Sequence, residues 1–325
     1  MGSFLRIAGT FLALAIGCVG NALSATTPFP DRPIRLIVPF VPGGAADVVA
    51  RRLVPGVSTR LGQTLVIDNR AGAGGILASE LTAKAAPDGY TLLLVTPSHT
   101  ANPALYKKLS YDTQKDFVAV TLICDAAGLF VVHPSVPANT IKEFIGYARS
   151  HPGALSYASP GSGTFPHLTT EMLKRKAGID VMHIPYKGAA PAMTDLIAGV
   201  VQAKVDAYIT ANTHIKSGRI KLLAVTSKAR VPQYADIPTI AEAGYPGFET
   251  TYWIGIVAPA GVPRQILAKI EAAFIGAVKE KEVAERLGVD GMRVIGSSAA
   301  ELDHLMAAEF PQWRQVVKEA GITPE

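Results

Sequence analysis

Two glycine-containing turns hold the residues of this chain that are best suited to binding chemistry. The first, Pro39–Asp47, follows the apolar run Ile34–Val38, and the second, Tyr157–His167, follows Leu155–Ala158. Each turn precedes a helical pattern, so it places the free backbone N–H groups of a helix N-terminus beside glycine, which lets a ligand approach closely. Together the two turns could hold a small anion, such as a carboxylate, without an arginine.

A single turn of this kind is more often an ordinary helix cap, and it is the pairing that favours a binding site. Two nearby side chains have two interpretations each. Asp47 lies three or four residues beyond the glycines and is better explained as a cap on the free N–H groups than as a ligand contact. His167 follows Thr164 in the first turn of the predicted helix and either contacts the ligand or holds the loop.

Short strands and helices alternate along the chain, which is typical of an α/β protein with parallel strands flanked by helices. The sequence predicts strands at 34–38, 64–67, 91–95, 129–132, 155–158, 181–184, 205–209, 220–225 and 253–257. It predicts helices at 45–61, 75–85, 141–150, 165–176, 189–198, 263–279, 281–287 and 299–320. Open α/β sheets bind ligands at the carboxyl ends of their strands, so we expect the ligand between two lobes that are joined by a hinge.

The N-terminus predicts export. Residues 1–24 read as a secretory signal peptide, with a short basic start, the apolar run Ile7–Val19 and small residues at Ala22 and Ser24. Cys18 lacks the Leu that usually stands three residues before a lipidated cysteine, so a lipid anchor there is the minority interpretation. Cleavage would leave Cys124 as the single thiol, which excludes an internal disulfide. No later run approaches the roughly 18 apolar residues of a transmembrane helix.

Composition and motifs exclude several function classes. With 325 residues, 49% of them hydrophobic, the chain is long enough for two domains. Its net charge of +5 is spread thinly, which argues against nucleic-acid binding. No His, Cys, Asp or Glu cluster has metal-ligand spacing. In Gly72-x-Gly74-Gly75, a dinucleotide fingerprint would need Gly or Ala where Leu77 stands, so we expect no cofactor.

An exported hydrolase is the rival interpretation from another class. Ser162 and His167 could form a triad with Asp180, Asp195 or Asp206. However, Gly161-Ser162-Gly163 lacks the Gly-x-Ser-x-Gly pattern of a nucleophile elbow. The sequence therefore favours a binding protein without enzymatic activity.

Several further stretches occur in one order along nearly the whole predicted mature chain. They are Pro30–Phe40 with the turn Pro42–Gly44, Asp68–Gly75, Ala86–Leu92, Asn102–Tyr106, Asp116–Phe117, Gly161–His167, His183–Gly188 and Leu222–Thr226. Taken together, the chain resembles the Bug family, also called TctC-like, the extracytoplasmic solute-binding proteins of tripartite tricarboxylate transporters. The resemblance implies a type II periplasmic binding protein of the Venus flytrap kind, with lobe 1 at residues 25–124 plus 234–325 and lobe 2 at residues 125–233.

In that family, backbone amides and bridging waters hold one carboxylate of the ligand. By position, the turn 40–44 and the loop 98–100 would form the wall of lobe 1, and residues 159–164 the opposite wall. The candidate ligand-binding residues are Phe40, Pro42, Gly43, Gly44, Asp47, Ser98, His99, Thr100, Ser159, Gly161, Ser162, Gly163, Thr164, His167 and Asp206. Asp206 could also be only a cap at the end of its strand. Relatives are expected to have a longer segment between Asp206 and His214, which leaves the ligand's second functional group open.

The resemblance also implies partners. A small carboxylate would be the ligand, with citrate, succinate, other dicarboxylates, amino acids, nicotinate and aromatic acids as candidates. The membrane subunits of a transporter would receive it from a periplasmic monomer. A ligand sensor that signals to a membrane histidine kinase stays as the alternative, since in both functions the membrane partner would recognise the closed, ligand-bound form.

Overall fold

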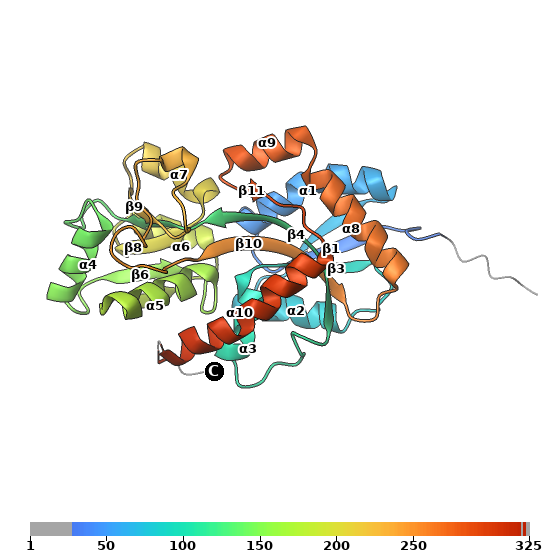
Figure 1. Ribbon diagram of the computed structural model, residues 1–325, viewed down its shortest axis with the longest axis horizontal. Coiled ribbons are helices and arrows are strands. Elements are labelled where there is room, and N and C mark those ends of the chain that lie inside the picture. Colours follow the sequence, from blue (N-terminus) through green and yellow to red (C-terminus); the bar gives the residue numbers. More distant parts are fainter. Residues whose placement is uncertain (1–27, 320, 323–325) are drawn as a thin grey trace, which may run out of the picture.

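The chain folds into two lobes, each built on one β-sheet with helices on both faces (Figure 1). The computed structural model describes residues 28–319, 321 and 322. The predicted signal peptide, its cleavage site and Cys18 lie outside these residues.

Sheet A, the sheet of the first lobe, has six strands in the order β11-β4-β10-β3-β1-β2. Its strands are β1 (Ile34–Val38), β2 (Leu65–Asn69), β3 (Thr91–Val95), β4 (Phe117–Ala127), β10 (Thr251–Pro259) and β11 (Arg293–Val294). β1 is parallel to β2 and β3, whereas β10 is antiparallel to β3 and β4. The carboxyl ends of the parallel strands therefore share one edge.

Sheet B has five strands in the order β7-β6-β8-β5-β9. They are β5 (Leu129–Val132), β6 (Ser156–Ser159), β7 (Met182–Pro185), β8 (Ala203–Asp206) and β9 (Lys221–Val225). β6 is parallel to β7 and β8, so these three strands also end at one edge.

Helices cover both faces of each sheet, with α1, α8 and α9 on one side of sheet A and α2, α3 and α10 on the other (Figure 1). Those of the first lobe are α1 (Ala45–Leu61), α2 (Ile76–Ala83), α3 (Pro97–Leu105), α8 (Arg264–Val278), α9 (Lys281–Val289) and α10 (Ala299–Glu319). Those on sheet B are α4 (Ile141–Ser150), α5 (Phe165–Ala177), α6 (Ala189–Ile197) and α7 (Tyr208–Lys216). Short 3₁₀ turns occur at Ala73–Gly75 and Pro232–Tyr234.

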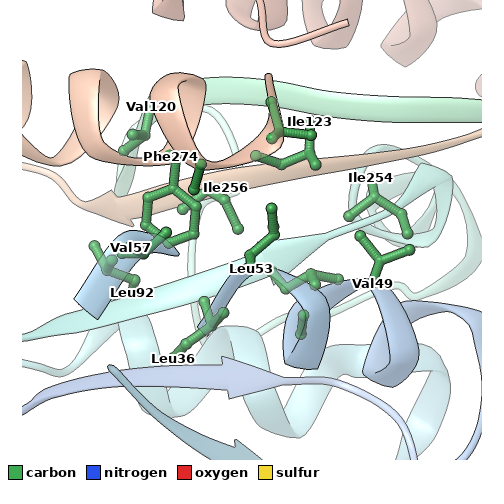
Figure 2. Close-up of a cluster of buried hydrophobic side chains, with 14 of the residues drawn as sticks. Leu36, Val49, Leu53, Val57, Leu92, Val120, Ile123, Ile254, Ile256 and Phe274 are labelled. Atoms are coloured by element: carbon green, nitrogen blue, oxygen red, sulfur yellow. The ribbon is translucent and has the colours of Figure 1, made fainter. Parts of the chain in front are cut away.

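The core beneath α1 shows why this helix forms. Val49, Leu53 and Val57 recur at helical spacing and are fully buried, and they face Phe274 of α8 and Leu36 of β1 (Figure 2). Burying a Val, Leu or Phe side chain contributes roughly 1.5–3 kcal/mol each. This packing fixes the direction of α1, and with it the position of the turn at its N-terminus.

The two sheets are joined at a hinge around Gly128. β4 ends at Ala127 and β5 begins at Leu129, so Gly128 alone links them. Its N–H donates to the Thr226 hydroxyl (2.8 Å), and the Thr226 N–H donates to the Gly128 carbonyl (2.9 Å). The Thr226 hydroxyl in turn donates to the carbonyl of Thr250, just before β10 (2.8 Å). We propose that the lobes divide at these residues.

Most predicted elements are confirmed; β11 was not predicted, and three other parts of the chain differ from prediction. Residues 98–100 lie in the first turn of α3, not in a loop; Pro97 suits a first helical turn, where its missing N–H costs nothing. β4 was not predicted, because it is buried along nearly its whole length and so lacks polar alternation. The predicted strand 205–209 is wrong beyond Asp206: α7 begins at Tyr208, and Ile209 packs against the core of the first lobe.

The hinge leaves no room for a side chain at Gly128. A Cβ there would lie 2.8 Å from Val205 Cγ1, 2.9 Å from Thr226 Oγ1 and 3.0 Å from Phe165 Cε1. We therefore expect Gly128→Ala to lower the free energy of unfolding by about 1–3 kcal/mol, the usual cost of overpacking. Chemical denaturation measures this difference.

Gly146→Ala is the matched control, since Gly146 is exposed in α4 with nothing within 4 Å of its Cβ position. It should stabilise the protein by up to about 1 kcal/mol, because glycine is unfavourable inside a helix. Equal stability of Gly128→Ala and the wild-type protein would contradict this account of the hinge.

Candidate functional site

A cavity lies between the two lobes, beside the hinge. Its empty volume is about 680 Å³, part of it open to solvent. The lining residues are Phe40, Val41, Gly44, Ala45, Ala46 and Ser98 from the first lobe, Ala127, Gly128 and Tyr252 from the hinge strands, and Pro160, Thr164, Phe165, Pro166, Gly188, Ala189, Asp206, Ala207 and Thr210 from the second lobe. This lining contains no Lys, Arg or His.

Five helix N-termini meet at this cavity. Each helix follows a strand that ends at the cavity edge of its sheet: β1, β3, β6, β7 and β8 lead into α1, α3, α5, α6 and α7. Their N-caps are Gly44, Thr96, Thr164, Gly188 and Ala207, and none of these residues makes a capping hydrogen bond with its own side chain. Each terminus carries roughly half a positive charge. The helix termini therefore contribute positive potential to the cavity without a cationic side chain.

In the first glycine turn, the Asp47 carboxylate accepts the hydrogen bond of the Gly43 amide, which is therefore not free to bind a ligand. The Gly43 N–H donates to Asp47 Oδ2 (2.9 Å), and Gly43 has the left-handed φ of +86° that this turn requires. Asp47 is only 1% exposed and does not line the cavity. The donors that face the cavity are therefore the next residues along, Gly44 to Ala46. Pro42 and Gly43 lie in the turn behind them.

The second glycine turn repeats this arrangement with a neutral acceptor. The Gly163 N–H donates to His167 Nδ1 (3.1 Å), again four residues along the chain. Burial lowers the pKa of His167 to about 4, so the ring is neutral at pH 7 and its proton is on Nε2. The ring stacks on His183 at 4.2 Å and does not line the cavity. His167 holds the turn and leaves Thr164 at the cavity wall.

The other residues of the second turn support it or meet the opposite lobe. The Ser159 hydroxyl donates to the Gly161 carbonyl (3.0 Å), and the Thr164 hydroxyl donates to the same oxygen (2.7 Å). A Cβ on Gly74 would lie 2.9 Å from the Ser162 carbonyl oxygen, and one on Gly163 would lie 2.7 Å from Leu105 Cδ1. Ser162 and Gly163 thus lie where the two lobes touch.

Of the three candidates in α3, only Ser98 faces the cavity. Its hydroxyl is buried and has no hydrogen-bond partner among the described residues. His99 lies 3.2 Å from the Ser79 hydroxyl through Nδ1, and burial lowers its pKa to about 3. The Thr100 hydroxyl donates to Glu309 of α10. His99 and Thr100 therefore belong to the core beneath the site.

Asp206 ends β8 and lines the far wall of the cavity. Its Oδ1 accepts from the Ala207 N–H (2.8 Å) and from the Thr210 hydroxyl (2.7 Å), both in the first turn of α7. The chain passes directly from this strand into the helix that carries His214, with Ala207 between them.

Sequence reasoning missed the N-termini of α6 and α7 and the aromatic wall. Gly188 follows β7, just as glycines follow the strands before the two predicted turns. This strand–glycine–helix pattern could have indicated the α6 N-terminus from the sequence. Phe165 and Tyr252 line the cavity 5.7 Å apart, ring centre to ring centre. Tyr252 comes from a strand 87 positions later, so nothing local in the sequence indicated the pair.

A hydrolase triad is not assembled among the described residues. His167 Nδ1 accepts from Gly163, Asp206 contacts Lys204 and α7, and Asp195 accepts from the Tyr186 hydroxyl (2.6 Å). No group of three or more His, Cys, Asp or Glu in the described part of the chain could hold a metal ion.

The Asp47 cap should be visible in the pH dependence of stability. Burial alone would raise its pKa, but hydrogen bonds from Arg51, Gly43 and Asn69 outweigh burial and lower it. We expect Asp47→Asn to cost about 1–3 kcal/mol at pH 7. Because the folded pKa is depressed, this contribution is complete above the unfolded value of about 3.9 and is lost as the pH falls below it.

Urea denaturation of both proteins from pH 7 to pH 3 would show the gap between them closing. Glu285→Gln is the control, since Glu285 is exposed and lies 3.9 Å from Lys281; it should change stability by less than about 1 kcal/mol. A gap that stays constant to pH 3 would show that the Asp47 charge does not matter.

Comparisons with known proteins agree with this geometry. The model of the tripartite tricarboxylate transporter family receptors matches residues 49–322. The chain is 35% identical to BugT of Bordetella pertussis over 323 residues (99% of this chain, 98% of that one). It is 37% identical to a UPF0065 protein of a Pseudomonas species over 309 residues (95% and 92%).

Solved structures superpose closely as well. One is an R. palustris protein with adipate, with a TM-score of 0.87 and 36% identity, covering 91% of this chain and all of that one. Another is MatC from Rhodopseudomonas palustris with bound malate, with a TM-score of 0.84 and 35% identity, covering 89% of this chain and all of that one. The periplasmic binding protein BugD gives 0.86 at 35% identity, with coverage of 91% and 100%. Within the described residues, no helix has the length and hydropathy to cross a membrane. The chain belongs to the TctC, or Bug, family of tripartite tricarboxylate transporter receptors and has their two-lobed periplasmic binding protein fold.

Proposed function

We propose that this protein captures a small carboxylate in the cavity between its lobes and delivers it to the membrane subunits of a tripartite tricarboxylate transporter. The observation that carries the proposal is the meeting of five helix N-termini at a cavity lined by no basic side chain. Unpaired backbone N–H groups at helix starts bind anions, and a carboxylate is the small anion that fits an otherwise apolar lining. The expected signal peptide would take the protein to the periplasm.

Closure of the lobes over the ligand is part of this proposal. A Cβ on Gly188 of the second lobe would lie 2.8 Å from Val41 Cγ2 of the first, and Gly163 approaches Leu105 as closely. Donors from both lobes therefore face one cavity only when the lobes are together. A ligand that contacts both walls favours this closed arrangement by its differential affinity for it.

The lining also limits the ligand's carbon skeleton. Phe40, Phe165 and Tyr252 give the cavity three aromatic walls. An acid with a short carbon chain would place its carboxylate at the helix N-termini and its methylene groups against these rings. The adipate and malate found with two relatives are acids of this size.

Thermal unfolding with a ligand panel tests the carboxylate requirement. We expect the purified mature protein to gain several degrees in Tm with at least one short mono- or dicarboxylate at millimolar concentration. The amide and methyl ester of that acid should give no shift, because they lack the charge that the helix termini attract. Equal shifts with acid and amide would refute the anion site.

Gly44 is the position at which to test the proposed wall. Its φ is −79°, and a Cβ would meet only the Val41 carbonyl oxygen, at 3.9 Å, so a side chain fits without strain. Asp and Asn are both good N-caps, so both variants should fold. Gly44→Asp puts a negative charge where the carboxylate would lie, and it should weaken binding by about a hundredfold or more.

Gly44→Asn has the same size without the charge and should lose clearly less affinity, which calorimetric titration can measure. Equal losses of affinity in the two variants would mean that the charge of the ligand does not lie near Gly44.

A further inference from the structure

A lysine lies in the core of the second lobe. Lys204 is in β8, the central strand of sheet B, and its side chain is completely buried. Its neighbours across the sheet are Val131 of β5 and Ala158 of β6, both buried apolar residues that pack with α6 and α7. Burying a charged ammonium in such surroundings is costly unless the charge is matched.

The matching charge is Asp206, two residues along the same strand. The Lys204 ammonium lies 2.6 Å from Asp206 Oδ2, and no other acceptor contacts it among the described residues. Asp206 lines the cavity, whereas Lys204 stands behind it and does not. Asp206 is the one acidic or basic residue of the lining. Lys204 therefore decides whether the far wall is charged or neutral.

Stability alone does not explain this pair. Replacing a buried ion pair by apolar residues of similar volume is often neutral or stabilising, because desolvation offsets the attraction. The Lys204 ammonium also lacks further acceptors that would repay its burial. The effect of the pair on the adjoining cavity is a more direct explanation: an uncompensated Asp206 would repel an anion and attract a cation.

We propose that Lys204 sets the ligand class by cancelling the charge of Asp206, so that the cavity accepts a diacid and rejects a ligand with an ammonium group at its far end. This inference rests on the proposed function, since it concerns the same cavity. Lys204 acts through Asp206, so it is a positioning and charge-balancing residue without ligand contact. The net field at the far wall is then that of the α6 and α7 N-termini, which favours a second carboxylate.

Three probes of one length test the proposal by calorimetric titration of the full mature protein: adipate, 6-aminohexanoate and hexanoate. The wild-type protein should bind adipate more tightly than 6-aminohexanoate. Lys204→Met should lower the adipate to 6-aminohexanoate affinity ratio by about tenfold or more, because Asp206 is then uncompensated. Asp206→Asn should move the ratio in the opposite direction, since Lys204 is then the uncompensated charge.

The double variant Lys204→Met/Asp206→Asn removes both charges and should restore the wild-type ratio within about threefold. A pair that served only folding would alter affinity for all three probes together and would leave their ratio unchanged. Lys221→Met is the control, since Lys221 lies in β9, the edge strand of the same sheet, and donates to the Val136 carbonyl (2.8 Å), away from the cavity lining. It should leave the ratio unchanged.

The two single variants should shift the affinity ratio in opposite directions. Either one can therefore test the proposal if the other does not fold. An unchanged ratio in a folded single variant overturns the role of Lys204. Wild-type binding of hexanoate without preference for adipate overturns the inference alone. Wild-type binding of none of the three acids, while a cationic or neutral solute raises Tm, overturns the proposed function and this inference with it.

Discussion

Unpaired N–H groups at the start of five helices are the constraint on which the site depends. A helix cannot satisfy its first amides internally, and here the N-cap residues of α1, α3, α5, α6 and α7 make no capping hydrogen bond with their own side chains. The strands before these helices end at the facing edges of two sheets. The topology therefore brings five strand ends and the five helix starts that follow them to one cavity.

The contacts that join the two lobes surround the cavity. The hydrogen bonds between Gly128 and Thr226 hold together the two segments that connect the lobes, and the close approaches at Gly163 and Gly188 keep the lobes in contact around the cavity. α10 packs on both lobes, since Trp313 and Val317 cluster with Leu105 of α3 and Leu168 of α5. Movement of the lobes must therefore also alter the packing of this C-terminal helix.

Local sequence patterns predicted the parts of the site that depend on local chemistry. Gly43-Gly44 and Gly161-Ser162-Gly163 mark helix starts because glycine is needed for their backbone angles and for close approach. The sequence favoured Asp47 as a cap and offered holding the loop as one of two roles for His167, but the amide that each accepts from, four residues earlier, became visible only with coordinates. His99 and Thr100 adjoin Ser98 in sequence, yet α10, about two hundred residues later, holds Thr100 in the core. No local pattern contains that contact.

The absence of basic side chains from the cavity lining has a consequence for the response to salt. Attraction between exposed charges is screened over about 8–10 Å at ordinary ionic strength, whereas interactions inside a closed, partly desolvated cavity are screened much less. In the proposed complex, a carboxylate held by backbone dipoles between closed lobes would be shielded from mobile ions by the surrounding protein. Salt would then slow the encounter of ligand and protein while hardly changing how long the closed complex lasts. In such a receptor the lifetime of the bound state, more than the rate of capture, would be a property of the backbone and would tolerate changes in the surrounding medium.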